Sequence, residues 1–207
     1  MLALPARRLE PADVAWATAL LAASCTGHPV LEYCCPGPEA QPTRQWLLEQ
    51  LLRFGLRFGR VYTNADASAV AVWLGPDHPG ATLGQLLRTG LLPAALWRLR
   101  WGGFRRLRRY LGATAGLRRH SVAVGTHYYL LALAVRPAAR GRGLGRRLLQ
   151  ATLVAMQATH AACYLDTQHP VQLGFFQRLG FRLAGQCATG HEASAPINWG
   201  LVREGRA

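Results

Sequence analysis

The stretch that decides the fold is YYLLALAVRPAARGRGLGRR, residues 128–147. An apolar run ends at Val135, and a glycine-rich turn then opens a segment whose leucines recur at helical spacing. A strand that passes through glycines into a helix exposes backbone N–H groups at the positive end of that helix, where phosphates bind. We therefore predict a turn that binds phosphate or pyrophosphate. It is formed by Arg140, Gly141, Arg142, Gly143, Leu144 and Gly145, and Arg146 adds positive charge beside it.

Two other kinds of phosphate-binding turn fit the sequence less well. A Walker A loop requires a lysine, and the chain contains none. A dinucleotide-binding fingerprint requires a third glycine where Arg146 stands. Asp166 does lie near the expected distance of a ribose-binding carboxylate. Only about forty residues follow it, however, which is too few to complete a doubly wound sheet.

Around this turn, the pattern of apolar residues predicts an α/β domain with a central mixed sheet and helices on both faces. Strand 127–135, helix 143–160 and strand 162–167 form a right-handed crossover between parallel strands. Residues 82–120 are predicted as a helical insert that Pro93 and a glycine pair interrupt. The other predicted elements are a strand at 7–9, helices at 11–24, 42–58 and 170–179, a hairpin of 60–63 with 68–74, and strands at 181–186 and 197–203.

Positive charge is concentrated in the middle of the chain. The net charge is +14, and all 24 basic residues are arginine. Fourteen of them lie between Asp77 and Asp166, a stretch without any acidic residue, and the rest of the chain is balanced. This distribution favours a polyanionic partner such as coenzyme A, nucleic acid or an anionic membrane surface. No stacking motif for nucleic acid is present, so we interpret the basic segment 97–110 as a flap with a solvated arginine face.

The cysteine and hydropathy patterns predict a cytoplasmic protein. Five cysteines, an odd number without a Cys-x-x-Cys pair, favour a reducing compartment and no metal site. No apolar run is long enough for a membrane span. Arg7-Arg8 before an apolar stretch faintly resembles an export signal, but Glu10 and Asp13 interrupt that pattern.

Motifs on both sides of the turn resemble the GNAT superfamily of N-acetyltransferases. Arg-x-x-Gly-x-Gly at 140–145 is similar to the acyl-CoA loop of that family, and FFQRLGF at 175–181 is similar to its characteristic ending. The segments 70–74, 127–130 and 196–199, together with His28-Pro29, resemble a bacterial subgroup that includes puromycin-type acetyltransferases. The resemblance covers nearly the whole chain and is strongest over 127–186.

The resemblance implies a GNAT-like fold in which the two parallel strands are splayed, with residues 1–207 forming one N-acetyltransferase domain. It implies an enzyme that transfers the acetyl group of acetyl-CoA to a primary amine of a small molecule or peptide by direct attack. Backbone groups at Leu133, Ala134 and Val135 would serve the pantetheine arm, and His169 and Phe176 would complete the coenzyme site. The acceptor would contact His28, Trp73 and Tyr129, beside the 82–120 flap.

The chain departs from the family pattern at the positions that usually transfer protons. Phe176 stands where a tyrosine general acid is common, Leu131 stands near a frequent glutamate base, and His169 replaces a common asparagine. The candidate catalytic residues are therefore Tyr129, His127, Asp166 and His169, acting directly or through water. The alternative is a catalytically lapsed scaffold that binds an anionic surface or nucleic acid. For the enzyme we expect no nucleic-acid partner, and a monomer or homodimer.

Overall fold

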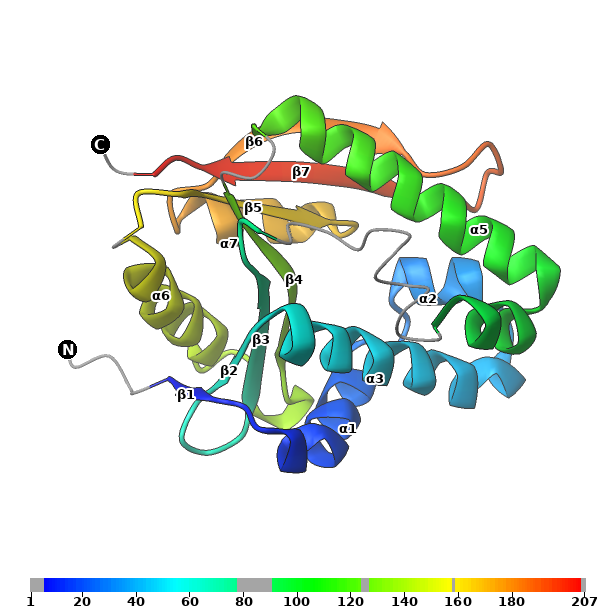
Figure 1. The fold of residues 1–207 in the computed structure, drawn as a ribbon, viewed down its shortest axis with the longest axis horizontal. Coiled ribbons are helices and arrows are strands. Elements are labelled where there is room, and N and C mark those ends of the chain that lie inside the picture. The colour runs from blue at the N-terminus through cyan, green and yellow to red at the C-terminus, as the bar shows by residue number, and fades with distance from the viewer. Residues whose placement is uncertain (1–5, 78–90, 124–126, 158, 206–207) are drawn as a thin grey trace.

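Seven strands form one mixed sheet in a computed structural model that describes residues 6–77, 91–123, 127–157 and 159–205 (Figure 1). The strand order is β1-β2-β3-β4-β5-β7-β6, and only the β4–β5 pair is parallel. The strands are β1 (Arg7–Arg8), β2 (Gly59–Thr63), β3 (Ala69–Leu74), β4 (His127–Val135), β5 (Ala162–Thr167), β6 (Arg182–Ala188) and β7 (Ile197–Arg203). The mixed α/β sheet predicted from the sequence is confirmed.

The parallel strands separate halfway along β4. Their pairing runs only from His127↔Ala162 to Leu130↔Leu165, whereas β4 stays paired with β3 as far as Val135. The β3–β4 register shifts so that Leu131 is the extra residue of a β-bulge. The splay that the resemblance implied is therefore present, and we call the region between residues 131–135 and Asp166 the fork.

Helices cover both faces of the sheet. On one face, α6 (Leu144–Gln157) and α7 (Leu173–Gln177) pack on the sheet, and Leu149, Leu153 and Met156 are almost fully buried there. On the other face lie α1 (Val14–Ser24) and α3 (Gln41–Phe58). Short helical turns complete the chain as η1 (Pro11–Asp13), α2 (Pro29–Cys34), η2 (Pro38–Ala40), η3 (Pro137–Ala139) and η4 (Pro170–Gln172).

The basic insert folds as the long helix α5 (Leu91–Ser121). It begins beside α2 and runs to β6 and β7 (Figure 1). The sequence prediction placed a break at Gly102-Gly103, but both glycines are helical and the backbone kinks at Arg100 (φ 54°) instead. Gly103 packs directly against the carbonyl of Cys34, so a close helix contact explains that glycine. The predicted helical residues 82–90 lie outside the described part of the chain.

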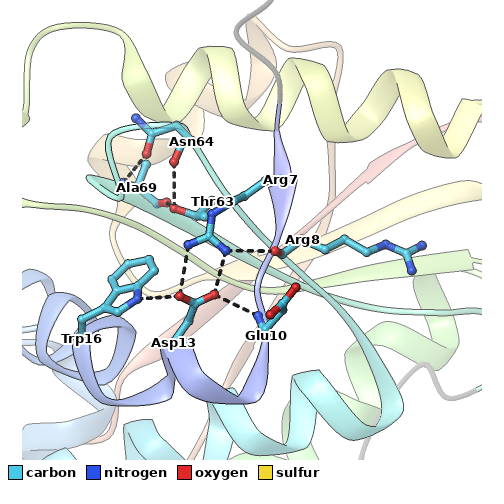
Figure 2. Close-up of polar contacts among 8 residues, drawn as sticks. All are labelled: Arg7, Arg8, Glu10, Asp13, Trp16, Thr63, Asn64 and Ala69. Atoms are coloured by element: carbon cyan, nitrogen blue, oxygen red, sulfur yellow. Dashed lines mark hydrogen bonds and ion pairs between the residues drawn. The ribbon is translucent and has the colours of Figure 1, made fainter.

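A carboxylate fastens the start of α1 to the first strand. Figure 2 shows the Asp13 side chain accepting hydrogen bonds from Arg7 (2.7 and 3.1 Å), from the backbone N–H of Glu10 (3.0 Å) and from the indole of Trp16 (2.9 Å). The hydrogen bond from Arg7 and the others hold the pKa of Asp13 well below its usual range. The predicted helix 11–24 therefore begins with a 3₁₀ turn whose last residue ties together strand, turn and helix.

The β2–β3 turn holds the end of β4. Asn64 Oδ1 accepts the backbone N–H groups of Ser68 (3.0 Å) and Ala69 (2.9 Å), as Figure 2 shows for Ala69. The backbone carbonyl of Ser68 in turn accepts the N–H of Arg136 at 2.8 Å. An asparagine-stabilised turn thus fixes the residue that follows β4, just before the glycine-rich turn.

Candidate active site

The glycine-rich turn after β4 is open to solvent. Gly141 (φ 76°) and Gly143 (φ 71°) adopt left-handed conformations that other residues rarely take. A Cβ added at either position would meet no atom of the described residues within 4 Å, its chain neighbours apart. By contrast, Gly145 is buried, and a Cβ there would lie 3.1 Å from the Val135 side chain. The turn therefore leaves room for a ligand beside the first turn of α6, where helix N–H groups favour anions.

The end of α1 braces this turn, through a residue that the sequence analysis missed. Ser24 Oγ donates a hydrogen bond to the carbonyl of Val135 (2.9 Å), and Arg140 donates one to the carbonyl of Ser24 (2.8 Å). Arg147 donates a hydrogen bond to the carbonyl of Arg142 (2.6 Å) within the turn itself. Arg140 therefore positions the loop, whereas the exposed Arg142 and Arg146 offer their charge to the solvent side. No local sequence signal links Ser24 to Val135, because they are 111 positions apart.

The fork exposes one edge of β4. Past Leu130 the strand has no partner on its β5 side among the described residues, and both Leu133 and Val135 are only partly buried. Ala134 is 4% exposed and packs with α1 and α3. An open strand edge offers backbone N–H and C=O groups to an extended ligand in the way that a neighbouring strand would.

Asp166 lies at the fork and is paired with Tyr129. It is the first residue of β5 beyond the last pair with β4, and Tyr129 Oη donates to its Oδ2 at 3.1 Å. Burial raises the pKa of Asp166 to about 6, although the Tyr129 hydrogen bond and the Arg118 charge oppose the rise. The residue as a whole keeps some exposure to solvent. A carboxylate with this pKa can accept a proton near neutral pH.

Four residues outside the predicted set surround this carboxylate. The charge of Arg118 and the side-chain hydrogen bonds of Asn198 and Gln168 partly offset the rise in the pKa of Asp166 that burial causes. Gln168 also donates to Tyr110 Oη (3.1 Å) and to Asn198 Oδ1, while the Arg118 guanidinium lies 4.7 Å from the centre of the Tyr129 ring. These residues come from α5, β7 and the end of β5, so only the folded chain brings them together.

His28 and His169 also meet near the fork. Their ring centroids are 5.3 Å apart in an edge-to-face arrangement, with His28 just before α2 and His169 two residues after β5. Burial, together with the nearby His169, lowers the pKa of His28 to about 4, so His28 is neutral at physiological pH. Beside His28 is a surface hollow of about 430 Å³, lined by Gly27, Pro29, Glu32, Tyr33, Pro36, Arg106, Ser194 and Pro196.

Two other predicted residues, His127 and Phe176, are buried in the protein. His127 is 2% exposed at the opposite end of β4 from the turn, with Nδ1 3.1 Å from the carbonyl oxygen of Ala123. Phe176 is 6% exposed and packs edge-to-face against Phe175 and Phe181. The structure does not bring His127 together with Asp166 or His169 by any direct contact among the described residues.

Trp73 requires a correction. The sequence analysis expected its side chain to contact the acceptor, but it is 0% exposed in the core on the α6 face. Its indole N–H donates to Thr152 Oγ1 at 3.2 Å, so its polar atom is already satisfied inside the protein. Because β3 is covered on both faces, the sequence did not show on which side of the sheet this residue lies.

Residues 103–183 match the sequence model of the acetyltransferase (GNAT) domain. This segment includes the fork, the open turn and Asp166. This part of the chain therefore matches a GNAT acetyltransferase domain.

Solved structures share the fold of this protein over almost its whole length. A structure of histone acetyltransferase HPA2 and related acetyltransferase from Corynebacterium glutamicum has a TM-score of 0.68 and 18% identity, covering 100% of this chain and 98% of the other. The polyamine N-acetyltransferase of Drosophila melanogaster has a TM-score of 0.59 and 19% identity, with 97% and 99% covered. The ribosomal-protein-S18-alanine N-acetyltransferase of Escherichia coli has a TM-score of 0.53 and 13% identity, with 98% and 94% covered. At these identities the likeness establishes the fold alone.

Within the GNAT fold, this protein combines common and uncommon features. The turn and fork follow the family pattern, whereas Phe176 and Leu131 occupy positions that the sequence analysis associated with an acid and a base. The Asp166–Tyr129 pair supplies titratable groups in that neighbourhood instead. The resemblance to the puromycin-type subgroup stays a prediction.

Proposed function

We propose that this acetyltransferase moves the acetyl group of acetyl-CoA to a primary amine, with Asp166 as the general base. The observation that carries the proposal is a carboxylate with a pKa raised to about 6, located where β4 and β5 separate. An amine must lose a proton as it forms an amide, and a base with a pKa near the working pH serves that step best.

The coenzyme would lie along the turn and the fork. The open space at Gly141 and Gly143 fits a pyrophosphate, and Arg142 and Arg146 would add charge-assisted contacts. The free edge at Leu133 and Val135 would pair with an extended pantetheine arm. Bound acetyl-CoA supplies an acetyl group activated as a thioester. Ser24 and Arg140 hold the strand end and the loop in place for it.

On this proposal the amine attacks directly, without a covalent enzyme intermediate. The nitrogen forms an amide bond as the carbon–sulfur bond of the thioester breaks, and Asp166 accepts the proton that leaves the nitrogen. Burial and the Asp166 charge raise the pKa of Tyr129 well above its usual range, so its hydroxyl stays protonated and orients the carboxylate. Neutral His28 and the adjacent His169 would contact the acceptor side.

The acceptor would enter through the hollow beside His28. Its wall carries the carboxylate of Glu32 and the guanidinium of Arg106, so it presents both signs of charge. These groups suit a small molecule or a peptide terminus that bears its own polar groups. A single domain over residues 1–207, a cytoplasmic location and a monomeric or homodimeric state belong to the same proposal.

The test is release of free thiol from acetyl-CoA in the presence of a panel of primary amines, including polyamines, amino acid amides and short peptides. The proposal predicts amine-dependent thiol release and acetylated product by mass spectrometry. Thiol release that never exceeds the amine-free rate, in a protein that binds acetyl-CoA, would point to the lapsed scaffold instead. Failure to bind acetyl-CoA at millimolar concentration would remove the coenzyme assignment as well.

A further inference from the structure

The outer face of α5 combines exposed indoles with arginines. Trp97 is 81% exposed and Trp101 is 69% exposed, and Leu96 beside them is 41% exposed. Arg100, Arg105 and Arg108 are also exposed on this helix. We call these six residues the α5 outer face. Large aromatic side chains normally gain stability by burial, so two such exposed tryptophans, one on each side of the kink at Arg100, indicate a surface that contacts something else.

The fold holds this face outward. Ala95 and Leu99 are 3% and 6% exposed and pack against α2, with Phe104 and Leu107 against the same cluster. The kink at Arg100 lies between the two tryptophans. Apolar residues of α5 therefore pack into the same cluster both before and after the kink. Beyond the kink, Trp101, Arg105 and Arg108 follow helical spacing along one stripe.

The arginines of this face are free to meet an external anion. Arg109, on the inner side, pairs with Glu192 at 3.1 Å, and Arg106 donates to the carbonyl of Tyr33. Within residues 6–77, 91–123, 127–157 and 159–205, Arg100, Arg105 and Arg108 make no ion pair. The sequence also has no acidic residue between Asp77 and Asp166. Positive charge here is therefore not neutralised by neighbouring carboxylates.

We propose that the α5 outer face docks the enzyme on an anionic lipid bilayer. Indole rings prefer the boundary between headgroups and acyl chains, and guanidinium groups bind lipid phosphates. The aliphatic Leu96 extends the apolar tip and has no stacking role toward nucleic acid. None of the described helices is both long and apolar enough to cross a bilayer, so the contact is peripheral. This docking lies outside the acetyl-transfer site and would place the enzyme close to membrane-bound or membrane-proximal amines.

The experiment is flotation of the full protein with vesicles of phosphatidylcholine alone or containing phosphatidylglycerol. We expect binding only to the anionic vesicles, falling steeply with salt. The double substitution Trp97→Ser/Trp101→Ser should weaken binding about tenfold or more. Arg105→Gln/Arg108→Gln should weaken it about twenty-five-fold, from about fivefold for each charge removed.

The matched control is Val154→Ser/Val171→Ser. These valines are 67% and 88% exposed on α6 and η4, and their loss should leave vesicle binding unchanged. All three double variants should keep the wild-type rate of acetyl transfer with a soluble amine, which separates this inference from the proposed function. Equal binding by the tryptophan variant, binding to an oligonucleotide but not to vesicles, or a dimer that protects Trp97 from quenching would each overturn the proposal.

Discussion

Replacing Asp166 with asparagine removes the proposed base while keeping the size of the side chain and an acceptor for the Tyr129 hydroxyl. If Asp166 takes the proton from the amine, kcat/KM should fall by about 10²- to 10⁴-fold. In the unaltered protein, kcat/KM should rise with pH and level off above the Asp166 pKa of about 6. The substitution should abolish that rise.

The same substitution should leave the fold at least as stable at neutral pH. The pKa of Asp166 lies at about 6 instead of 3.8, so ionising this carboxyl costs the folded state up to about 3 kcal/mol. The folded protein therefore holds this proton more tightly than the unfolded chain. Its stability should fall as pH rises from about 4 to about 6 and keep that loss at higher pH. Asp166→Asn removes the charge, and with it this loss.

The assay is guanidinium unfolding of both proteins at about pH 4 and about pH 8, together with initial rates across the same range. The matched control is Asp77→Asn, at an exposed position away from the fork, which should change neither rate nor stability. An Asp166→Asn protein that keeps its rate within about threefold and its pH profile would show that another group accepts the proton. A loss of activity accompanied by lower stability at pH 8 would instead assign Asp166 a structural role.

Three further results follow from the structure. Gly143→Leu should abolish acetyl-CoA binding in calorimetry. The control Gly27→Leu should retain binding, because Gly27 has nearly the same backbone φ and equally open surroundings. Equal affinities of the two variants would place the coenzyme elsewhere. Asp13→Ala should lower the melting temperature at neutral pH, by about 2–4 °C. Because the pKa of Asp13 is lowered, its stabilising contribution is present above the unfolded pKa and should vanish as the pH falls through the folded pKa; a difference that persists in acid would contradict the ion-pair account. Trp73→Phe should lower the free energy of unfolding by about 1–3 kcal/mol, because it removes the hydrogen bond that Thr152 Oγ1 accepts and leaves a small cavity in the core. The KM for the acceptor should not change; a raised KM with unchanged stability would return Trp73 to the acceptor site.

Local sequence was sufficient for the features that depend on neighbouring residues. The two glycines of the turn require backbone angles that other residues avoid, and the leucines after them repeat at helical spacing. These signals act within a few residues, so the strand, turn and helix of residues 127–157 were predictable together. The kink at Arg100 was not predictable, because no glycine or proline marks it. Packing of Gly103 on α2 keeps the glycine pair helical instead.

The face on which a residue lies was harder to predict than the element to which it belongs. All six residues of β3 are buried, so alternation could not separate the α6 face from the α1 face, and Trp73 was misplaced. The sequence also did not show that the indoles of α5 are exposed, because the same tryptophans could have packed on the sheet.

The sequence by itself indicated the reaction class proposed for this protein, since the glycine-rich turn and the ending at 175–181 are contiguous motifs whose geometry is local. Tertiary structure alone decided which groups can do the chemistry. The parallel register of β4 and β5 places Tyr129 against Asp166 across 37 positions, and the surrounding burial raises the pKa of that carboxyl. Desolvation and long-range pairing depend on what the folded chain brings around a side chain, and no single stretch of sequence contains that information.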